Sequence, residues 1–329
     1  MEIRGARIAG LGAYVPEKVL TNEDLCNIVD TNDEWIVEHT GIRERRVVAE
    51  DQVTSDLAYE AARRALDDAN VNAEDIGLII VATVTPDTIF PATASIVQDK
   101  LGVRGVNTFD LVSGCTGWIQ ALATGAQFIQ TGCINHALVI GAETLTTITD
   151  WTDRATCVLF GDGAGAAVLS PCAPGDGLLS FAADTQGDAG RLLMIPAGGS
   201  RQRLTPELLA AHDDCIRMVG HEVFKLAVRG CPEIASQALS KAGVAPEDVD
   251  VMVMHQANIR IIDAAAKRLD IPYEHMVINL DRYGNTSAAT IGLALDEYKR
   301  NTGLNPGDIV LMVGFGAGFS LASAVFRWC

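Results

Sequence analysis

Residues 65–81 read ALDDANVNAEDIGLIIV, and residues 238–254 read ALSKAGVAPEDVDVMVM. The two stretches align without a gap, and positions 65 and 238 are 173 residues apart, about half of the 329-residue chain. Each reads as the end of an amphipathic helix, a short polar link and an apolar run typical of a buried strand. Because this order of elements is common, chance similarity is the alternative. We favour a duplication.

The ends of the two halves support this interpretation. The first half closes with HALVIGAETL at 136–145 and VLFGDGAGAAVLS at 158–170, and the second with DIVLMVGFGAGFSLASAVFRW at 308–328. Each end contains a strand and a glycine-rich turn that leads into an apolar segment. Strands that alternate with helices predict an α/β fold with parallel or mixed sheets covered by helices. Two such halves would meet face to face, with a site at their contact.

The composition is ordinary for a soluble globular protein of two packed units, with 48% hydrophobic and 20% charged residues. No apolar run reaches the roughly 18 residues of a membrane span, and MEIRGARIAGLGAYVP at the start lacks the pattern of a secretory signal. The eight cysteines form no C-x-x-C pair and no cysteine–histidine cluster at metal spacing. We therefore expect a cytoplasmic protein with reduced thiols, no metal site and no membrane contact.

The net charge of −17, from 42 acidic and 25 basic residues, argues against general nucleic-acid binding, which needs a basic surface. The same charge argues against docking on anionic lipid. An acidic partner could bind only through a local basic patch.

A candidate nucleophile lies within NTFDLVSGCTGWIQALATGAQFIQTG at 107–132. A strand is expected over 108–112, a turn at 113–114 and a helix beyond, so Cys115 would lie at the start of that helix. Unpaired backbone N–H groups and the positive end of the helix dipole favour a thiolate there. A buried structural cysteine in a tight turn is the alternative for this stretch alone.

A candidate histidine lies within VMVMHQANIRIIDAAAKRL at 251–269. The expected strand stops at His255, and the next helix begins near Asn258. Doubly wound folds place their sites at such strand ends. A lone histidine is more often a structural group, which is the alternative reading.

Two turns complete the set. In NLDRYGNTSAATIGLAL at 279–295, Asn285 follows a glycine, and Thr286 or Ser287 is the expected N-cap of the next helix. The glycine-rich GFGAGFS at 314–320 can present backbone N–H groups but lacks the Lys-Ser/Thr of a phosphate loop, and lies too late for a dinucleotide fingerprint. A cysteine, a histidine and an asparagine at element ends, beside a glycine turn able to form an oxyanion hole, fit nucleophilic acyl transfer.

These residues carry a resemblance over essentially the whole chain. The sequence resembles the β-ketoacyl-acyl carrier protein synthase III family, initiating condensing enzymes of the thiolase superfamily. The shared motifs are TNEDL at 21–25, TNDEWI at 31–36, TGIRERR at 40–46, DRATCVLFGDGAGA at 153–166, HQANIRII at 255–262 and YGNTSAA at 283–289.

The resemblance implies a thiolase-like layered α/β/α/β/α fold from two duplicated halves, 1–172 with the nucleophile and 173–329 with His255 and Asn285. It implies that Cys115 accepts the acyl group of an acyl-CoA, acetyl or another short starter. His255 and Asn285 would stabilise the enolate formed when malonyl-acyl carrier protein loses CO2, and this carbanion would attack the acyl-cysteine. The backbone N–H groups of Cys115 and Gly318 would form the oxyanion hole.

The resemblance also implies binding roles. Trp35 and Arg154 match residues that hold the CoA adenine, with Thr31 beside them. Phe90 matches a residue that reaches into the partner's acyl pocket in a homodimer and limits acyl length. No cofactor is implied beyond acyl-CoA as substrate. The pantetheine tunnel would be lined by Gly220, Phe224 and Asn258, and the acidic carrier protein received by Lys225, Arg260, Lys267 and Arg268.

Plain packing is the alternative for Trp35 or Phe90 alone, and a solvated helix face for the basic group. Four positions depart from the family pattern and bear on substrate choice: His39, His221, Trp118 and Ala317.

Other functions remain open for the same residues. A related acyltransferase, or a condensing enzyme of specialised metabolism, would use the same Cys-His-Asn set. A degradative thiolase usually needs a second cysteine near the C-terminal glycine turn, which 314–321 lacks. The duplication and the turn at 314–320 argue against a cysteine hydrolase. A dimeric scaffold without catalytic activity would make the three polar residues a coincidence.

Overall fold

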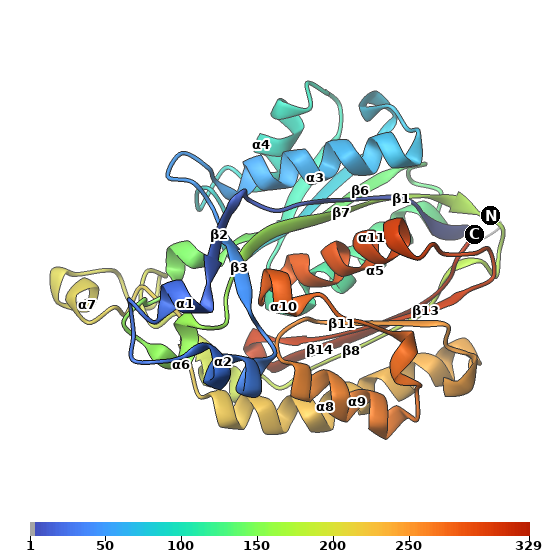
Figure 1. The fold of residues 1–329 in the computed structure, drawn as a ribbon. Coiled ribbons are helices and arrows are strands. Elements are labelled where there is room, and N and C mark those ends of the chain that lie inside the picture. Colours follow the sequence, from blue (N-terminus) through green and yellow to red (C-terminus); the bar gives the residue numbers. More distant parts are fainter. Residues whose placement is uncertain (1–3) are drawn as a thin grey trace.

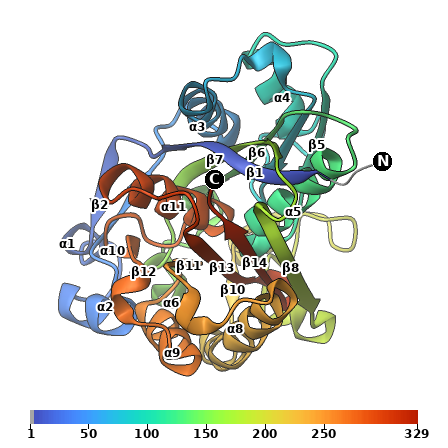
Figure 2. The ribbon, with the colours of Figure 1, turned by 90° about the vertical axis from the view of Figure 1, so that its right-hand side faces the viewer.

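The computed structural model describes residues 4–329, which stack in five layers, α/β/α/β/α (Figure 1). Helices α3 and α4 cover the outer face of one sheet, and helices α8 and α9 cover the outer face of the other. Helices α5 and α11 lie between the two sheets (Figure 2). The predicted layered fold is confirmed. The helices of these layers are α3 (Thr54–Ala69), α4 (Thr93–Lys100), α5 (Gly117–Gln130), α8 (Gly220–Ala242), α9 (Ile259–Leu269) and α11 (Thr290–Asn301).

Each sheet has parallel and antiparallel neighbours, as the sequence predicts. The first has the strand order β5-β4-β6-β7-β1 and the second β12-β11-β13-β14-β8. One pair of residues, Ala6 and Gly177, joins β1 to β8, so the strands of the two sheets form a continuous order of ten. The strands are β1 (Gly5–Tyr14), β4 (Leu78–Ala82), β5 (Asn107–Leu111), β6 (Ala137–Thr144), β7 (Asp162–Cys172), β8 (Gly177–Thr185), β11 (Val251–Met254), β12 (Met276–Val277), β13 (Ile309–Gly316) and β14 (Ser320–Arg327).

The two halves repeat one another element by element. Strands β4 and β11 begin at residues 78 and 251, and helices α5 and α11 at residues 117 and 290, so both pairs are 173 positions apart. This is the spacing of the two similar sequence stretches, and the order of strands in the sheets corresponds throughout. Duplication therefore accounts for the architecture. The exact division into 1–172 and 173–329 stays a prediction.

The central layer is the tightest part of the core. Trp118 on α5 is fully buried there, between strand β6 and helix α11. A Cβ added at Gly141 or at Gly292 would lie 3.0 Å from the indole, so glycine at both positions makes room for it. This packing fixes α5, and with it the turn at its N-terminus.

The remaining elements gather near one end of the sheets, at the left of Figure 1. Within residues 4–329, no helix is both long and apolar enough to span a membrane. The elements that gather at this end of the sheets are β2 (Lys18–Thr21), α1 (Asn22–Leu25), α2 (Asp33–Thr40), β3 (Glu44–Val47), α6 (Arg154–Cys157), β9 (Leu193–Met194), α7 (Pro206–Ala210), β10 (Arg217–Met218) and α10 (Leu280–Tyr283).

Candidate active site

Cys115 lies in a 3-10 turn, η2 (Gly114–Thr116), between β5 and α5. Its neighbour Gly114 has a φ of 52°, a left-handed conformation that favours glycine. A Cβ at Gly316 would lie 2.6 Å from the Cys115 nitrogen, so this glycine permits the close approach of β13. Burial raises the pKa of the Cys115 thiol to about 12. The expected thiolate is therefore wrong for the resting site, because burial, the largest effect on this pKa, favours the neutral thiol.

His255 follows the last residue of β11, as predicted, and is buried against Phe315 with ring centroids 5.2 Å apart. Its backbone N–H donates to the carbonyl of Val313 at 2.8 Å. Burial lowers the pKa of the imidazole to about 3, so the ring is neutral. Nδ1 lies 2.7 Å from the hydroxyl of Thr290, the first residue of α11, which leaves Nε2 for a ligand.

Two backbone hydrogen bonds to the segment 159–161 hold Asn285 in place. Its N–H donates to the carbonyl of Leu159 at 2.9 Å, and its carbonyl accepts the N–H of Gly161 at 3.0 Å. The side-chain Oδ1 accepts the N–H of Ser287 at 2.8 Å. The amide NH2 is therefore the end of the side chain that remains to donate to a ligand.

The expected N-cap at Thr286 or Ser287 is wrong. A 3-10 turn, η7 (Ser287–Ala289), intervenes before α11, and neither side chain caps a helix. The Ser287 hydroxyl instead donates to Glu143 on β6 at 3.0 Å, and it lies close enough to the Cys115 side chain to act on the pKa of the thiol. The Ser287 carbonyl lies 3.0 Å from the Thr290 hydroxyl. One serine thus connects the surroundings of all three predicted catalytic residues.

The glycine turn packs against the nucleophile turn. Gly318 has a φ of 81° in η8 (Ala317–Phe319), and η8 contacts η2. The hydroxyls of Thr116 and Ser320 lie 2.9 Å apart and join the two turns. The side chain of Ala317, which departs from the family pattern, lies against Gly114 and lines the cavity beside Cys115.

That cavity has a volume of about 260 Å³ and mainly apolar walls. Cys115 and Ser287 lie on its surface. Trp118 is not among the lining residues, so its bulk bears on the central layer instead. The apolar walls fit an acyl chain and include Leu145, Ile148, Phe160, Leu193, Ile195 and Ile216.

The residues predicted to hold adenine lie together at the surface. The guanidinium carbon of Arg154 lies 4.3 Å from the centroid of the Trp35 ring. His39 stacks on the same indole with centroids 4.4 Å apart and an interplanar angle of 20°. The hydroxyl of Thr31 is buried and has no hydrogen-bond partner among the described residues.

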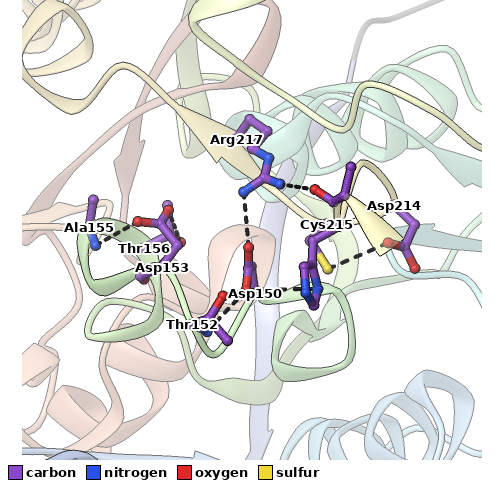
Figure 3. Close-up of polar contacts among 10 residues, drawn as sticks. Asp150, Thr152, Asp153, Ala155, Thr156, Asp214, Cys215 and Arg217 are labelled. Atoms are coloured by element: carbon purple, nitrogen blue, oxygen red, sulfur yellow. Dashed lines mark hydrogen bonds and ion pairs between the residues drawn. The ribbon is translucent and has the colours of Figure 1, made fainter. Parts of the chain in front are cut away.

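Figure 3 shows how the turn that carries Arg154 is anchored. Asp153 caps α6 by accepting the N–H of Ala155 at 3.0 Å. Asp150, which is buried, accepts from Arg217 at 3.0 Å. This ion pair ties β10 to the segment that carries Ile148, so it also holds one wall of the cavity.

Asn258 is the N-cap of α9, since its Oδ1 accepts the Arg260 N–H at 2.9 Å. Its NH2 donates to the carbonyl of His39 at 2.8 Å, so its amide already ties α2 to α9. Gly220 is exposed at the start of α8, and Phe224 is half-buried one turn later.

Phe90 is 83% exposed and its neighbour Ile89 is 89% exposed. Phe90 is not among the residues that line the cavity of its own chain.

The predicted basic group is exposed on α8 and α9, which pack side by side. Lys225 lies 3.3 Å from Glu222 and 3.0 Å from Nε2 of His221, and Arg260 lies 3.8 Å from Glu38. His221 therefore belongs to this polar surface. Lys267 and Arg268 occupy the last turn of α9.

Sequence reasoning missed Glu143, Ser287 and Thr290 as parts of the site. Ser287 lies in the YGNTSAA motif, where it is expected only as a cap, and Thr290 follows that motif directly. Glu143 had one signal: it is an acid in a strand, HALVIGAETL, expected to be buried. A buried carboxylate needs partners, and those partners lead to Cys115.

Comparison with known proteins identifies the family. Residues 109–187 match the family model for 3-oxoacyl-[acyl-carrier-protein] synthase III, and residues 239–328 match the model for its C-terminal part. A β-ketoacyl-[acyl-carrier-protein] synthase III of Desulfitobacterium hafniense is 53% identical over 321 residues, 98% of this chain and 97% of the relative. The chain belongs to the β-ketoacyl-[acyl-carrier-protein] synthase III family. As a member of this synthase III family it is an acyl-transferring condensing enzyme.

Solved structures agree with the synthase III assignment. The 3-oxoacyl-[acyl-carrier-protein] synthase III of Aquifex aeolicus has a TM-score of 0.91 at 43% identity, covering 98% of this chain and 100% of that chain. The priming β-ketosynthase of the R1128 polyketide pathway has a TM-score of 0.92 at 34% identity, covering 99% and 97%. Synthase III and a polyketide priming enzyme thus share this fold.

Proposed function

We propose that this synthase III joins an acyl-CoA to malonyl-acyl carrier protein by decarboxylative Claisen condensation and so initiates fatty-acid synthesis. The products are a β-ketoacyl-acyl carrier protein, CoA and CO2. One observation carries the proposal: contacts through Ser287 and Thr290 connect His255 and Asn285, and Ser287 shares the wall of an apolar cavity with Cys115. Family membership supplies the reaction class.

In the first half-reaction, the sulfur of Cys115 attacks the thioester carbonyl of acyl-CoA, such as acetyl-CoA or another short starter. The backbone N–H groups of Cys115 and Gly318 are the proposed donors to the oxyanion. The packing of η2 against η8 supports this pairing. Fixed donors in a site without water stabilise the developing charge without reorganisation.

In the second half-reaction, the malonyl thioester loses CO2 and negative charge develops on its carbonyl oxygen. Nε2–H of His255 and the amide NH2 of Asn285 are the proposed donors to that oxygen. A neutral imidazole suits this role, since it donates one hydrogen bond without acting as an acid. The carbanion then attacks the acyl group on Cys115, and the two reactants are already adjacent.

The CoA adenine is proposed to bind at Trp35, with the hydroxyl of Thr31 as a polar contact. A base between two flat groups needs about 7 Å, twice a van der Waals contact of about 3.5 Å. Arg154 lies at 4.3 Å, so it has to move outward to stack on a bound base. His39, which stands where the family frequently has an arginine, also stacks on the indole of Trp35.

The pantetheine arm is proposed to pass Gly220, Phe224 and Asn258 on its way to Cys115. The carrier protein is proposed to dock on the exposed basic residues of α8 and α9. These residues form a local basic patch although the net charge of the whole chain is −17. These residues are Lys225, Arg260, Lys267 and Arg268.

A homodimer and a cytoplasmic location complete the proposal. Two adjacent large apolar side chains, Ile89 and Phe90, are almost fully exposed, which is typical of a surface that a partner covers. In the proposed dimer, Phe90 reaches the acyl pocket of the partner subunit. No cofactor is proposed beyond the acyl-CoA substrate.

Purified protein incubated with acyl-CoA and malonyl-acyl carrier protein tests the reaction. Release of CO2 together with a β-ketoacyl-acyl carrier protein, weighed intact, is the expected result. An acyl-enzyme without condensation would favour an acyltransferase with the same catalytic set. Condensation only with a polyketide carrier protein would favour the priming role of the R1128 relative.

A further inference from the structure

Glu143 is a fully buried carboxylate that the reaction as proposed does not use. Its Oε2 accepts hydrogen bonds from the Thr83 hydroxyl at 3.1 Å, the Val84 N–H at 3.0 Å and the Thr85 hydroxyl at 2.7 Å. Its Oε1 accepts one, from the Ser287 hydroxyl at 3.0 Å. The two oxygens therefore have different surroundings. Only Oε1 is connected to the nucleophile Cys115, through the hydroxyl of Ser287.

The threonine hydroxyls are committed to Oε2. Oγ1 of Thr83 accepts the N–H of Thr85 at 3.1 Å, and Oγ1 of Thr85 accepts the N–H of Thr144 at 2.9 Å. Their own protons are left to point at Glu143. Ser287 differs, because its hydroxyl lies between a carboxylate oxygen and the sulfur of Cys115. Its hydrogen bonds can reverse direction without breaking any other contact.

Ser287 is also held in an unfavourable backbone conformation, with a φ of 48°. Left-handed conformations are rare for serine and cluster at functional sites. Here the conformation lets the N–H bond Asn285, the carbonyl bond Thr290 and the hydroxyl reach Glu143.

We propose that Ser287 and Glu143 form a proton relay for Cys115, which takes the thiol proton during acylation and returns it after condensation. This inference rests on the proposed function, because the two half-reactions define when the proton leaves and when it returns. Ser287 contacts the reacting sulfur, and Glu143 acts through Ser287.

During acylation, the S–H bond of Cys115 breaks as the C–S bond forms. The thiol proton passes to Oγ of Ser287, and the Ser287 proton passes to Oε1 of Glu143. The tetrahedral intermediate then expels CoA as a thiolate, which takes its proton from solvent.

After condensation, the Cys115 thiolate is the leaving group. The proton returns from Glu143 through Ser287, and the resting thiol is restored. Over one cycle the relay is unchanged, and one solvent proton ends on CoA.

Relative basicity supports Glu143 as the acceptor. Burial raises the pKa of Glu143 to about 7, whereas burial lowers the pKa of His255 to about 3. Glu143 therefore changes its protonation state near neutral pH, where its ionised form can accept a proton, and His255 is a far weaker base.

The groups around Glu143 are mostly neutral. The segment directly after β4 contributes the two threonines, and β7 places Gly163 opposite. Among the described residues, Cys115 of η2 is a titratable group whose pKa the nearby charge of Glu143 raises. Asp162, the first residue of β7, accepts instead from Thr146 and Val48.

Two measurements test the relay between pH 5 and 9. The first is the single-turnover rate at which Cys115 is acylated by acyl-CoA, followed by intact mass. The second is the rate of Cys115 alkylation by iodoacetamide, which needs no CoA. The wild type should show an inflection near pH 7 in both, with faster reaction at higher pH, because ionised Glu143 accepts the proton.

Glu143→Gln and Ser287→Ala should each lose this inflection and acylate about 10²-fold more slowly at pH 7. The double variant should be no slower than either single variant, because both remove one relay. Asp162→Asn is the matched control, since it removes a buried carboxylate that does not reach Cys115. It should keep the inflection.

The relay is overturned if either variant keeps the inflection, or if Asp162→Asn loses it as well. Should Glu143→Gln fail to fold, Ser287→Ala decides alone. A wild type that forms no adduct with any acyl-CoA contradicts the proposed function, whereas the alkylation profile still tests the relay by itself.

Discussion

The hydroxyl of Thr290 lies 2.7 Å from Nδ1 of His255, and this contact bears on which ring nitrogen carries the proton. A hydroxyl has one proton, and here it has two acceptors, Nδ1 and the Ser287 carbonyl at 3.0 Å. For Nε2–H to face the malonyl thioester, Thr290 must donate to Nδ1. Thr290 is therefore a positioning residue for the neutral imidazole.

Thr290→Val should slow condensation by about 10- to 100-fold, because the imidazole loses the donor that fixes its tautomer. Acylation of Cys115 does not use Nε2 and should keep its rate. Measuring the rate of acylation and the rate of condensation separately checks this. Thr124→Val is the control, since that hydroxyl donates only to the Gln120 carbonyl within α5. Equal loss in both half-reactions would contradict the positioning role.

Glu143→Gln should change how stability depends on pH. Burial raises the pKa of Glu143 from 4.5 to about 7, so the folded protein holds this proton more tightly than the unfolded chain. The wild type should lose free energy of unfolding relative to the variant as pH rises from about 4.5 to about 7, by about 3 kcal/mol in total. Urea unfolding of both proteins at pH 5 and pH 8 measures the difference. A pH-independent difference would contradict the raised pKa.

Trp35→Ala should raise the KM for acyl-CoA by about tenfold, equal to about 1.4 kcal/mol of lost stacking, and leave kcat unchanged. The matched control is an acyl-N-acetylcysteamine thioester, which has no adenine. Steady-state kinetics with both substrates should show the loss only for the CoA ester. A loss with both substrates would mean that Trp35 supports the fold of the site instead.

Phe90→Ser should weaken the proposed dimer, because it removes a large apolar side chain from the surface that the partner would cover. Sedimentation velocity across a range of protein concentrations measures the shift toward monomer. Leu209→Ser is the comparison, since Leu209 on α7 is another large apolar side chain, 48% exposed, and its removal tests whether loss of any exposed apolar side chain has the same effect. A wild type that sediments as a monomer at all concentrations would contradict the dimer.

The repeated stretches at 65–81 and 238–254 predicted the fold, because period and spacing carry over directly into strands and helices. The element ends at His255 and near Asn258 were also correct, since apolar runs and caps are local features. The N-cap at 286–287 was wrong for a tertiary reason: the Ser287 hydroxyl bonds Glu143, which is 144 positions away.

The protonation state of Cys115 could not be predicted from the sequence, because it too depends on tertiary contacts. A helix N-terminus is visible in the sequence, but the burial that raises the thiol pKa depends on β13 and the glycine at position 316. Likewise the distance of Arg154 from Trp35 and the contact between Thr290 and His255 join segments that are distant in the chain.

Intact mass of the protein after incubation with a panel of acyl-CoA esters, beside a Cys115→Ser sample, tests the central claim most directly. The account predicts an increase equal to one acyl group in the wild type and none in the variant. Added malonyl-acyl carrier protein should remove the adduct and yield the β-ketoacyl product. An adduct that persists in Cys115→Ser, or a wild type that none of the esters modifies, would contradict it.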